Sequence, residues 1–147
     1  MFLHIEPESG LAIYDQIVRQ IKFAVAGGAL PPAELIPSVR ELARELAVNP
    51  NTVARAYQQL QNEGVVESVR GQGLAVSRGA DKRCKAERAK LIGSRLRETL
   101  DEALRAGLEI ADIRQLVLEQ VEQLQARRKT VLDVPQAEPR RDISQKG

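Results

Sequence analysis

The chain is poor in aromatic residues, which make up 3% of its 147 residues, and it has no tryptophan. Its core must therefore be built from Leu, Ile, Val and Ala, which favours helices packed on helices over a β-sandwich or a barrel. A single cysteine excludes an internal disulfide framework and is typical of a reducing compartment, so we expect a cytoplasmic protein. No apolar run approaches the roughly 20 residues that cross a bilayer, so we expect no membrane partner.

Residues for catalysis are equally scarce. His4 is the only histidine and Cys84 the only cysteine. One subunit therefore lacks the side chains for a zinc site, a Cys–His pair or a Ser–His–Asp triad. The sequence also lacks a Walker-type glycine-rich loop. We expect neither an enzyme nor a bound metal or cofactor.

Charge is unevenly distributed along the chain, although the net charge is only +2. Residues 1–77 contain 6 Lys and Arg against 8 Asp and Glu, whereas residues 78–147 contain 16 against 12. The N-terminal half is thus not basic as a whole. Any hypothesis of nucleic-acid binding must rest on individually placed charges.

The N-terminal half contains three short helical patterns. The first covers residues 12–26, where isoleucine or valine recurs every four residues. The second begins at Ser38, which has the spacing of a capping box with Glu41. The third begins at Asn49 as N-cap, with Pro50 at the first helical position, where a missing N–H costs nothing.

Two short strand patterns, residues 65–69 and 74–77, follow the third helix. They are joined by a turn at residues 70–73, where two glycines permit positive φ. The fold class predicted is mainly α with a small β-hairpin. Helix, turn, helix and then a glycine-tipped hairpin is the pattern of a winged helix-turn-helix, which places its second helix in the major groove of DNA.

The residues expected to contact DNA lie at the starts of the second and third helices and in the hairpin turn. Amide, hydroxyl and guanidinium groups there can bind base edges or phosphates, and glycines let the backbone approach the minor groove. Taken singly, each of these residues could also be a helix cap, an ordinary turn residue or a solvated charge. The candidates are Ser38, Arg40, Asn49, Asn51, Thr52, Arg55, Arg70, Gly71, Gln72 and Gly73.

The C-terminal half predicts two further amphipathic helices, one ending near Arg105 and one over residues 110–128. Two antiparallel helices alone cannot hide both apolar stripes, so part of this surface should meet another chain. We predict a winged helix-turn-helix domain over residues 1–77, followed by a helical dimerisation region over 78–132 and a disordered tail over 133–147. The predicted dimer interface is Ile92, Leu96, Leu100, Leu104, Ile113, Val117, Val121 and Leu124.

Two segments are ambiguous. Residues 2–5 alternate apolar and polar side chains and could add a strand to another sheet. Residues 78–85 are charged without hydrophobic period, which predicts a linker or the exposed first turn of a helix. Cys84 lies there between Arg83 and Lys85. Cationic neighbours can lower a thiol pKa, so a redox-responsive thiol and an inert one are both open.

Several motifs, in order and at the expected spacing, closely resemble the GntR family of bacterial transcription regulators. They are Ile13–Ile17, Leu30–Pro32, Ile36–Ala43, Val48–Val53 and Glu63–Glu67. The segment Phe2–Ile5 and the short helical C-terminal part are similar to the YtrA subfamily.

This resemblance implies a homodimeric winged-helix repressor on an inverted-repeat, palindromic operator in double-stranded DNA. It assigns DNA contacts to Arg40, Asn51–Thr52, Arg55 and Gly71–Gly73. The chain departs from the family pattern at three positions. Ala33 stands where the family usually has glycine, Ala12 where a proline often precedes Ile-Tyr, and Leu74 where a threonine is usual.

A second hypothesis is a protein-interaction module, in which a winged helix has lost DNA binding and recruits a partner through its C-terminal helices. The negative net charge of residues 1–77 motivates it. Salt dependence separates the two hypotheses, because binding through phosphates weakens steeply with salt. Two short C-terminal helices leave little room for an enclosed ligand pocket, so the sequence leaves a small-molecule effector undetermined.

Overall fold

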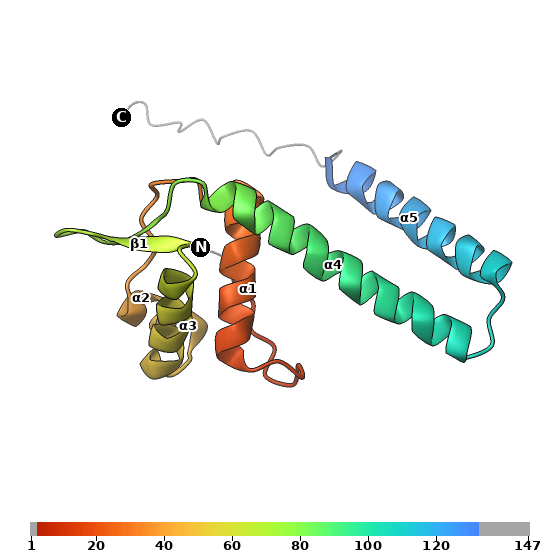
Figure 1. The fold of residues 1–147 in the computed structure, drawn as a ribbon, viewed down its shortest axis with the longest axis horizontal. Helices are drawn as coiled ribbons and strands as arrows, with labels where there is room; N and C mark the ends of the chain where they lie inside the picture. Colours follow the sequence, from red (N-terminus) through yellow and green to blue (C-terminus); the bar gives the residue numbers. More distant parts are fainter. Residues whose placement is uncertain (1–2, 133–147) are drawn as a thin grey trace, which may run out of the picture. The chain divides into compact units, whose positions relative to one another are not determined.

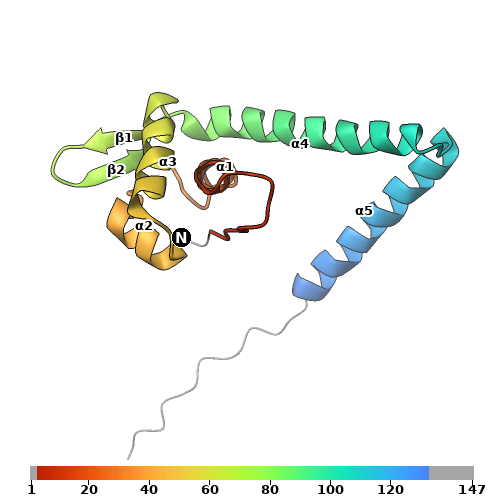
Figure 2. The ribbon, with the colours of Figure 1, turned by 90° about the horizontal axis from the view of Figure 1, so that it is seen from below.

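The computed structural model describes residues 3–132, and the predicted fold class is confirmed (Figures 1 and 2). Phe2 and the predicted tail, residues 133–147, lie outside the described residues. The described helices and strands are α1 (Ile13–Ala26), α2 (Val39–Leu46), α3 (Pro50–Asn62), β1 (Val66–Val69), β2 (Gly73–Val76), α4 (Ala80–Arg105) and α5 (Ile110–Leu132).

The chain divides into two compact units within α4, between Arg95 and Leu96. The first unit therefore includes the early turns of α4 and extends beyond residue 77, where the winged-helix domain is predicted to end. None of the helices within residues 3–132 combines the length and the apolar character needed to cross a membrane.

Both predicted helix starts are confirmed. At α2, the Ser38 hydroxyl oxygen accepts a 3.2 Å bond from the Glu41 N–H, and the Glu41 carboxylate accepts a 2.8 Å bond from the Ser38 N–H. At α3, Asn49 Oδ1 accepts a 2.8 Å bond from the Asn51 N–H, and Pro50 is the first helical residue. Each cap satisfies backbone donors that the helix cannot, so local chemistry determines where α2 and α3 begin.

The core of the first unit is aliphatic, as the scarcity of aromatic residues requires. α1 and α3 pack against each other, α2 packs across α3, and the start of α4 closes the core. Its largest fully buried side chains come from all of these elements and from the hairpin: Ile17, Ile21, Val25, Leu42, Val53, Leu60, Val66, Val76 and Cys84.

The segment before α2 pairs with the hairpin, an arrangement that the sequence did not indicate. The Ala33 N–H donates to the Val76 carbonyl at 2.8 Å, and the Ile36 N–H donates to the Leu74 carbonyl at 2.9 Å. Leu35 forms an isolated antiparallel bridge with β2. The wing is therefore anchored on its inner edge to the chain that leads into the helix-turn-helix.

The prediction that residues 2–5 add a strand to a sheet is wrong for residues 3–5, which form no strand. The carboxamide of Gln16, which is buried in α1, accepts from the Glu6 N–H at 2.8 Å and donates to the Glu6 carbonyl at 2.9 Å. Gln20 accepts from the His4 N–H at 2.7 Å. These side-chain amides satisfy backbone groups that a sheet would otherwise have paired.

Of the two alternatives for residues 78–85, a linker or the exposed first turn of a helix, the helix is confirmed from Ala80 onward, but two of its side chains are not exposed. Ala80 begins α4 and is fully buried, and Cys84, one turn later, is 1% exposed. Both small side chains face the core while their charged neighbours face solvent. Burial, and then the charge of Glu87, raise the pKa of the Cys84 thiol and outweigh the lowering effects of Lys22 and Arg83. The structure thus favours an inert thiol over a redox-responsive one.

Ala33 has a φ of +71°, in the left-handed region that disfavours a Cβ. We expect Ala33→Gly to raise the free energy of unfolding by about 0.5–1 kcal/mol, since relief of strain exceeds the added entropy of the unfolded chain. Urea denaturation measures the change. Ala29→Gly is the matched control, because Ala29 is also exposed but has no positive φ; that variant should lose stability. A loss in both variants would contradict the assignment of strain to Ala33.

Candidate nucleic-acid interface

A tight turn sets the crossing of α2 and α3. Ala47 ends α2 in the left-handed conformation, at φ +53°, and the Val48 N–H returns to the Ala43 carbonyl at 3.0 Å. The buried Tyr57 of α3 adds a second constraint, because its hydroxyl donates to the Pro37 carbonyl at 2.8 Å. Burial, followed by the negative charges of nearby glutamates, raises the pKa of Tyr57, so the phenol stays protonated and keeps this bond.

α3 presents its N-terminal end to solvent. Val53 and Leu60 lie on the buried side of the helix. Asn51 and Arg55 are exposed, and Thr52 is half-buried. The structure therefore places the three predicted contact residues of the recognition helix within its first two turns, where a helix-turn-helix meets base edges.

Arg55 has a partner that sequence reasoning missed. Its guanidinium carbon lies 3.8 Å from the centroid of the Tyr14 ring, which belongs to α1. Such stacking restricts the arginine while leaving the N–H groups at the edge of the guanidinium free to donate. Arg55 is therefore held by a cation–π contact rather than being a freely solvated charge. No local signal reveals Tyr14, because the contact depends on how α1 packs against α3.

The start of α2 combines a cap with an exposed cation. The Ser38 backbone N–H, and then its hydroxyl, hold the pKa of the Glu41 carboxyl below its usual value, so the cap persists at neutral pH. Arg40 is exposed. Within residues 3–132, its guanidinium has no ion pair or hydrogen bond. Ser38 thus acts as the cap, and Arg40 is available to a phosphate or a base edge.

The hairpin has the positive φ values that its two glycines predict. Gly71 and Gly73 have φ values of +77° and +117°, and the Gln72 N–H donates to the Val69 carbonyl at 3.0 Å. No heavy atom lies within 4 Å of the position that a Cβ would take at either glycine. Glycine is therefore favoured at these two positions by the positive φ of the backbone and not by a lack of room for a side chain. Gly73 pairs with Val69 and is the first residue of β2 rather than part of the turn. Arg70 and Gln72 are exposed beside them.

These candidate residues all lie in the first unit, on α2, on α3 and at the hairpin (Figure 2). A recognition helix with an exposed N-terminal end, a capped helix before it and a glycine-tipped wing after it define a winged helix-turn-helix, a class of DNA-binding proteins.

Comparison with known proteins identifies the family within this class. The family model described as bacterial regulatory proteins, gntR family, matches residues 13–76. The HTH-type transcriptional repressor YtrA of Bacillus subtilis strain 168 is 35% identical over 117 residues, which cover 80% of this chain and 90% of that protein.

Solved structures agree with this result. A GntR family transcriptional regulator from Listeria monocytogenes has a TM-score of 0.62 at 32% identity, covering 76% of this chain and 97% of that one. A transcriptional regulator from Oenococcus oeni has a TM-score of 0.65 at 28% identity, covering 82% and 99%. The chain belongs to the GntR family, with YtrA-like similarity over most of its length. It is a DNA-binding transcription regulator, and its relatives are regulators rather than enzymes.

Proposed function

We propose that this regulator is a homodimeric repressor, acting in the cytoplasm, that binds an inverted-repeat operator. The observation that carries the proposal is a row of large apolar side chains left exposed on α4 and α5. Of the eight residues predicted for the dimer interface, two, Leu100 and Ile113, are half-buried within the single chain. The other six are 37–57% exposed: Ile92, Leu96, Leu104, Val117, Val121 and Leu124.

A second copy of the chain is the partner that best explains this surface. Burying one such side chain contributes about 1.5–3 kcal/mol, and a two-fold axis lets the same apolar stripe serve both subunits. A two-fold symmetric dimer in turn matches an inverted-repeat operator. The two half-sites of such an operator lie roughly 34 Å apart along one face of the DNA. Repression by occupancy of a promoter is supported by the similarity to YtrA, which is named a repressor.

In this proposal, each subunit reads one half-site. Asn51, Thr52 and Arg55 meet base edges in the major groove, and Arg40 meets a phosphate or a base edge beside them. The wing tip, Arg70–Gly73, approaches the adjacent minor groove.

A footprint of the purified protein on genomic fragments, including its own upstream DNA, tests this function at two salt concentrations. We expect protection of a short palindrome that weakens steeply at the higher salt concentration, because binding releases counterions from several phosphates. Binding of a protein partner that is insensitive to salt, with no protected DNA, would instead support the interaction-module hypothesis.

Arg55→Ala and Arg40→Ala are each expected to weaken operator binding by about 1–3 kcal/mol if the lost contact is to a base edge. Fluorescence anisotropy with labelled operator measures the change. Arg127→Ala removes the same charge from an exposed position on α5 and is the control. Affinity equal to that of the control in both variants would defeat the assignment of these residues to the interface.

A further inference from the structure

Tyr14 is one of two tyrosines in a chain that is only 3% aromatic, and its ring lies against an arginine of the recognition helix. The Arg55 guanidinium carbon is 3.8 Å from the centroid of this ring. In the part of the chain that the structure describes, residues 3–132, neither the Arg55 guanidinium nor the Tyr14 hydroxyl makes an ion pair or a hydrogen bond. The ring face is therefore the part of Tyr14 that holds Arg55.

A stacked arginine differs from an ion-paired arginine in what it can still bind. A carboxylate partner occupies N–H groups at the edge of the guanidinium, and the same edge forms the two-pronged contact with a base. An aromatic ring contacts the guanidinium face and leaves that edge free. Stacking also restricts a long side chain before DNA binds, which reduces the conformational entropy lost on binding.

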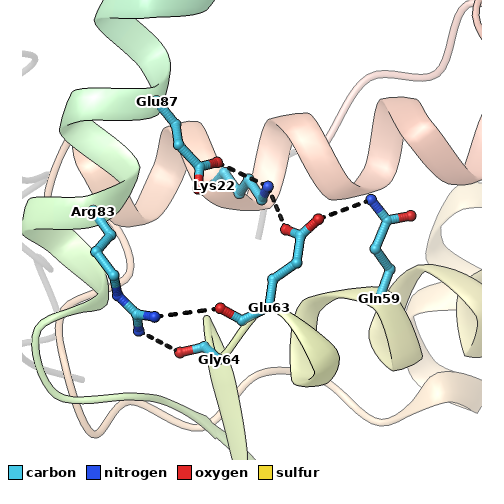
Figure 3. Close-up of polar contacts among 6 residues, drawn as sticks. All are labelled: Lys22, Gln59, Glu63, Gly64, Arg83 and Glu87. Atoms are coloured by element: carbon cyan, nitrogen blue, oxygen red, sulfur yellow. Dashed lines mark hydrogen bonds and ion pairs between the residues drawn. The ribbon is translucent and has the colours of Figure 1, made fainter.

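The packing of α1 against α3 fixes the position of the Tyr14 ring. Tyr14 is half-buried and packs against the aliphatic core. Eight residues further along each helix, the Lys22 ammonium of α1 pairs with the carboxylate of Glu63, the residue that caps α3 (Figure 3). Two contacts, about 12 Å apart along each helix, thus determine how α1 lies beside the recognition helix.

The early turns of α4 reinforce this arrangement at the end of α3. Lys22, whose side chain is 15% exposed, also pairs with the Glu87 carboxylate at 2.9 Å. The Arg83 guanidinium donates to the Glu63 carbonyl at 3.3 Å and to the Gly64 carbonyl at 2.6 Å (Figure 3). All of these residues belong to the first unit, as Tyr14 and Arg55 do. Contacts within that unit alone therefore hold the ring against Arg55.

We propose that Tyr14 is a positioning residue for base recognition, which holds the Arg55 guanidinium so that its edge meets O6 and N7 of one guanine in each half-site. The inference rests on the proposed function, in which Arg55 meets a base edge. Guanine is the base that fits, because it presents two neighbouring acceptors in the major groove to a group that can only donate. Tyr14 acts through Arg55.

The test measures the fluorescence anisotropy of operator duplexes with the full chain. In each duplex one guanine, in both half-sites of the footprinted operator, is replaced by 7-deazaguanine, which lacks the N7 acceptor. The guanine sensitivity of a variant is the ratio of its affinities for the unmodified and the modified duplex. This ratio is internal to each variant, so a partly unfolded preparation does not change it. Thermal melting reports folding separately.

Four variants separate the ring from the other properties of Tyr14. Tyr14→Phe keeps the ring and removes the hydroxyl, whereas Tyr14→Leu keeps an apolar side chain against the core and removes the ring. Phe23→Leu is the matched control, because it removes a half-buried ring from the same helix more than two turns away. Arg55→Ala removes the group that is expected to bind the base.

At one guanine, the wild-type protein, Tyr14→Phe and Phe23→Leu should lose about tenfold in affinity on modification, and Arg55→Ala less than about twofold. For Tyr14→Leu the loss should be only about threefold, because the unstacked arginine reaches the base less often. Adding Tyr14→Leu to Arg55→Ala should not weaken binding further, since both changes remove the same contact.

The wild-type sensitivity in Tyr14→Leu would overturn the positioning role of the ring. A loss of sensitivity in Tyr14→Phe would also overturn it, because the hydroxyl would then be the group that matters. If the wild-type protein is insensitive at every guanine, or Arg55→Ala keeps the wild-type sensitivity, the contact between Arg55 and guanine is wrong. A failure of the proposed function is distinguishable from these results, because no palindrome would then be protected in the footprint.

Discussion

Leu96→Asp is expected to yield monomers and to lower operator affinity by about a hundredfold or more. Leu96 is 53% exposed on α4, in the apolar row that we assign to the subunit interface. A carboxylate buried there would lose its hydration without gaining a partner. A monomer also loses the second half-site, and with it the gain from linked binding. Sedimentation velocity measures the oligomeric state, and anisotropy measures the affinity.

Ser94→Asp provides the matched control for this experiment. Ser94 is exposed on the same helix, two residues before Leu96 and so on nearly the opposite side of α4. The control should remain dimeric and bind the operator like the wild type. An intact dimer in the Leu96→Asp variant would mean that the interface lies elsewhere.

Leu42→Ala is expected to lower the free energy of unfolding by about 2–5 kcal/mol. Leu42 is fully buried in α2, the helix that packs across α3. Removing its branched end leaves a cavity beneath the recognition helix. The expected decrease in the free energy of unfolding is a large part of the roughly 5–15 kcal/mol that stabilises a domain. Urea denaturation followed by circular dichroism measures the loss.

Leu46→Ala is the comparison on the same helix. Leu46 is half-buried at the last turn of α2, so the same chemical change should remove less contact and cost less stability. Equal decreases in the free energy of unfolding would show that the two leucines contribute equally to stability despite their different burial. That result would contradict the larger contribution to stability expected from Leu42.

Local chemistry made the central part of the fold predictable. The capping box at Ser38, the N-cap at Asn49 and the four-residue period of α1 each involve neighbours within one helical turn, so spacing alone indicates them. The wing was predictable for the same reason, because Gly71 in the turn and Gly73 at the start of β2 permit the positive φ that the hairpin requires. These elements locate the candidate DNA contacts, whose roles remain predictions.

One prediction was wrong and another was only half right where burial, rather than sequence pattern, decided the outcome. A helix start was one alternative for residues 78–85, but the charged neighbours of Ala80 and Cys84 gave no sign that these two side chains are buried. Alternation in residues 2–5 suggested a strand, but Gln16 of α1 binds the adjacent backbone instead. In both cases contacts with distant parts of the chain decided the outcome: the core for Ala80 and Cys84, and Gln16 of α1 for Glu6.

The sequence by itself determined the order of the elements, the starts of α2 and α3, and the glycine turn of the wing, because hydrogen bonds between near neighbours specify them. Only the tertiary structure decided that Tyr14 holds Arg55 and that Lys22 and Arg83 tie the end of α3 to α4. The physical reason is that these contacts join residues far apart in the chain. They form only when α1, α3 and α4 pack together, and the spacing of residues along the sequence does not predict that packing.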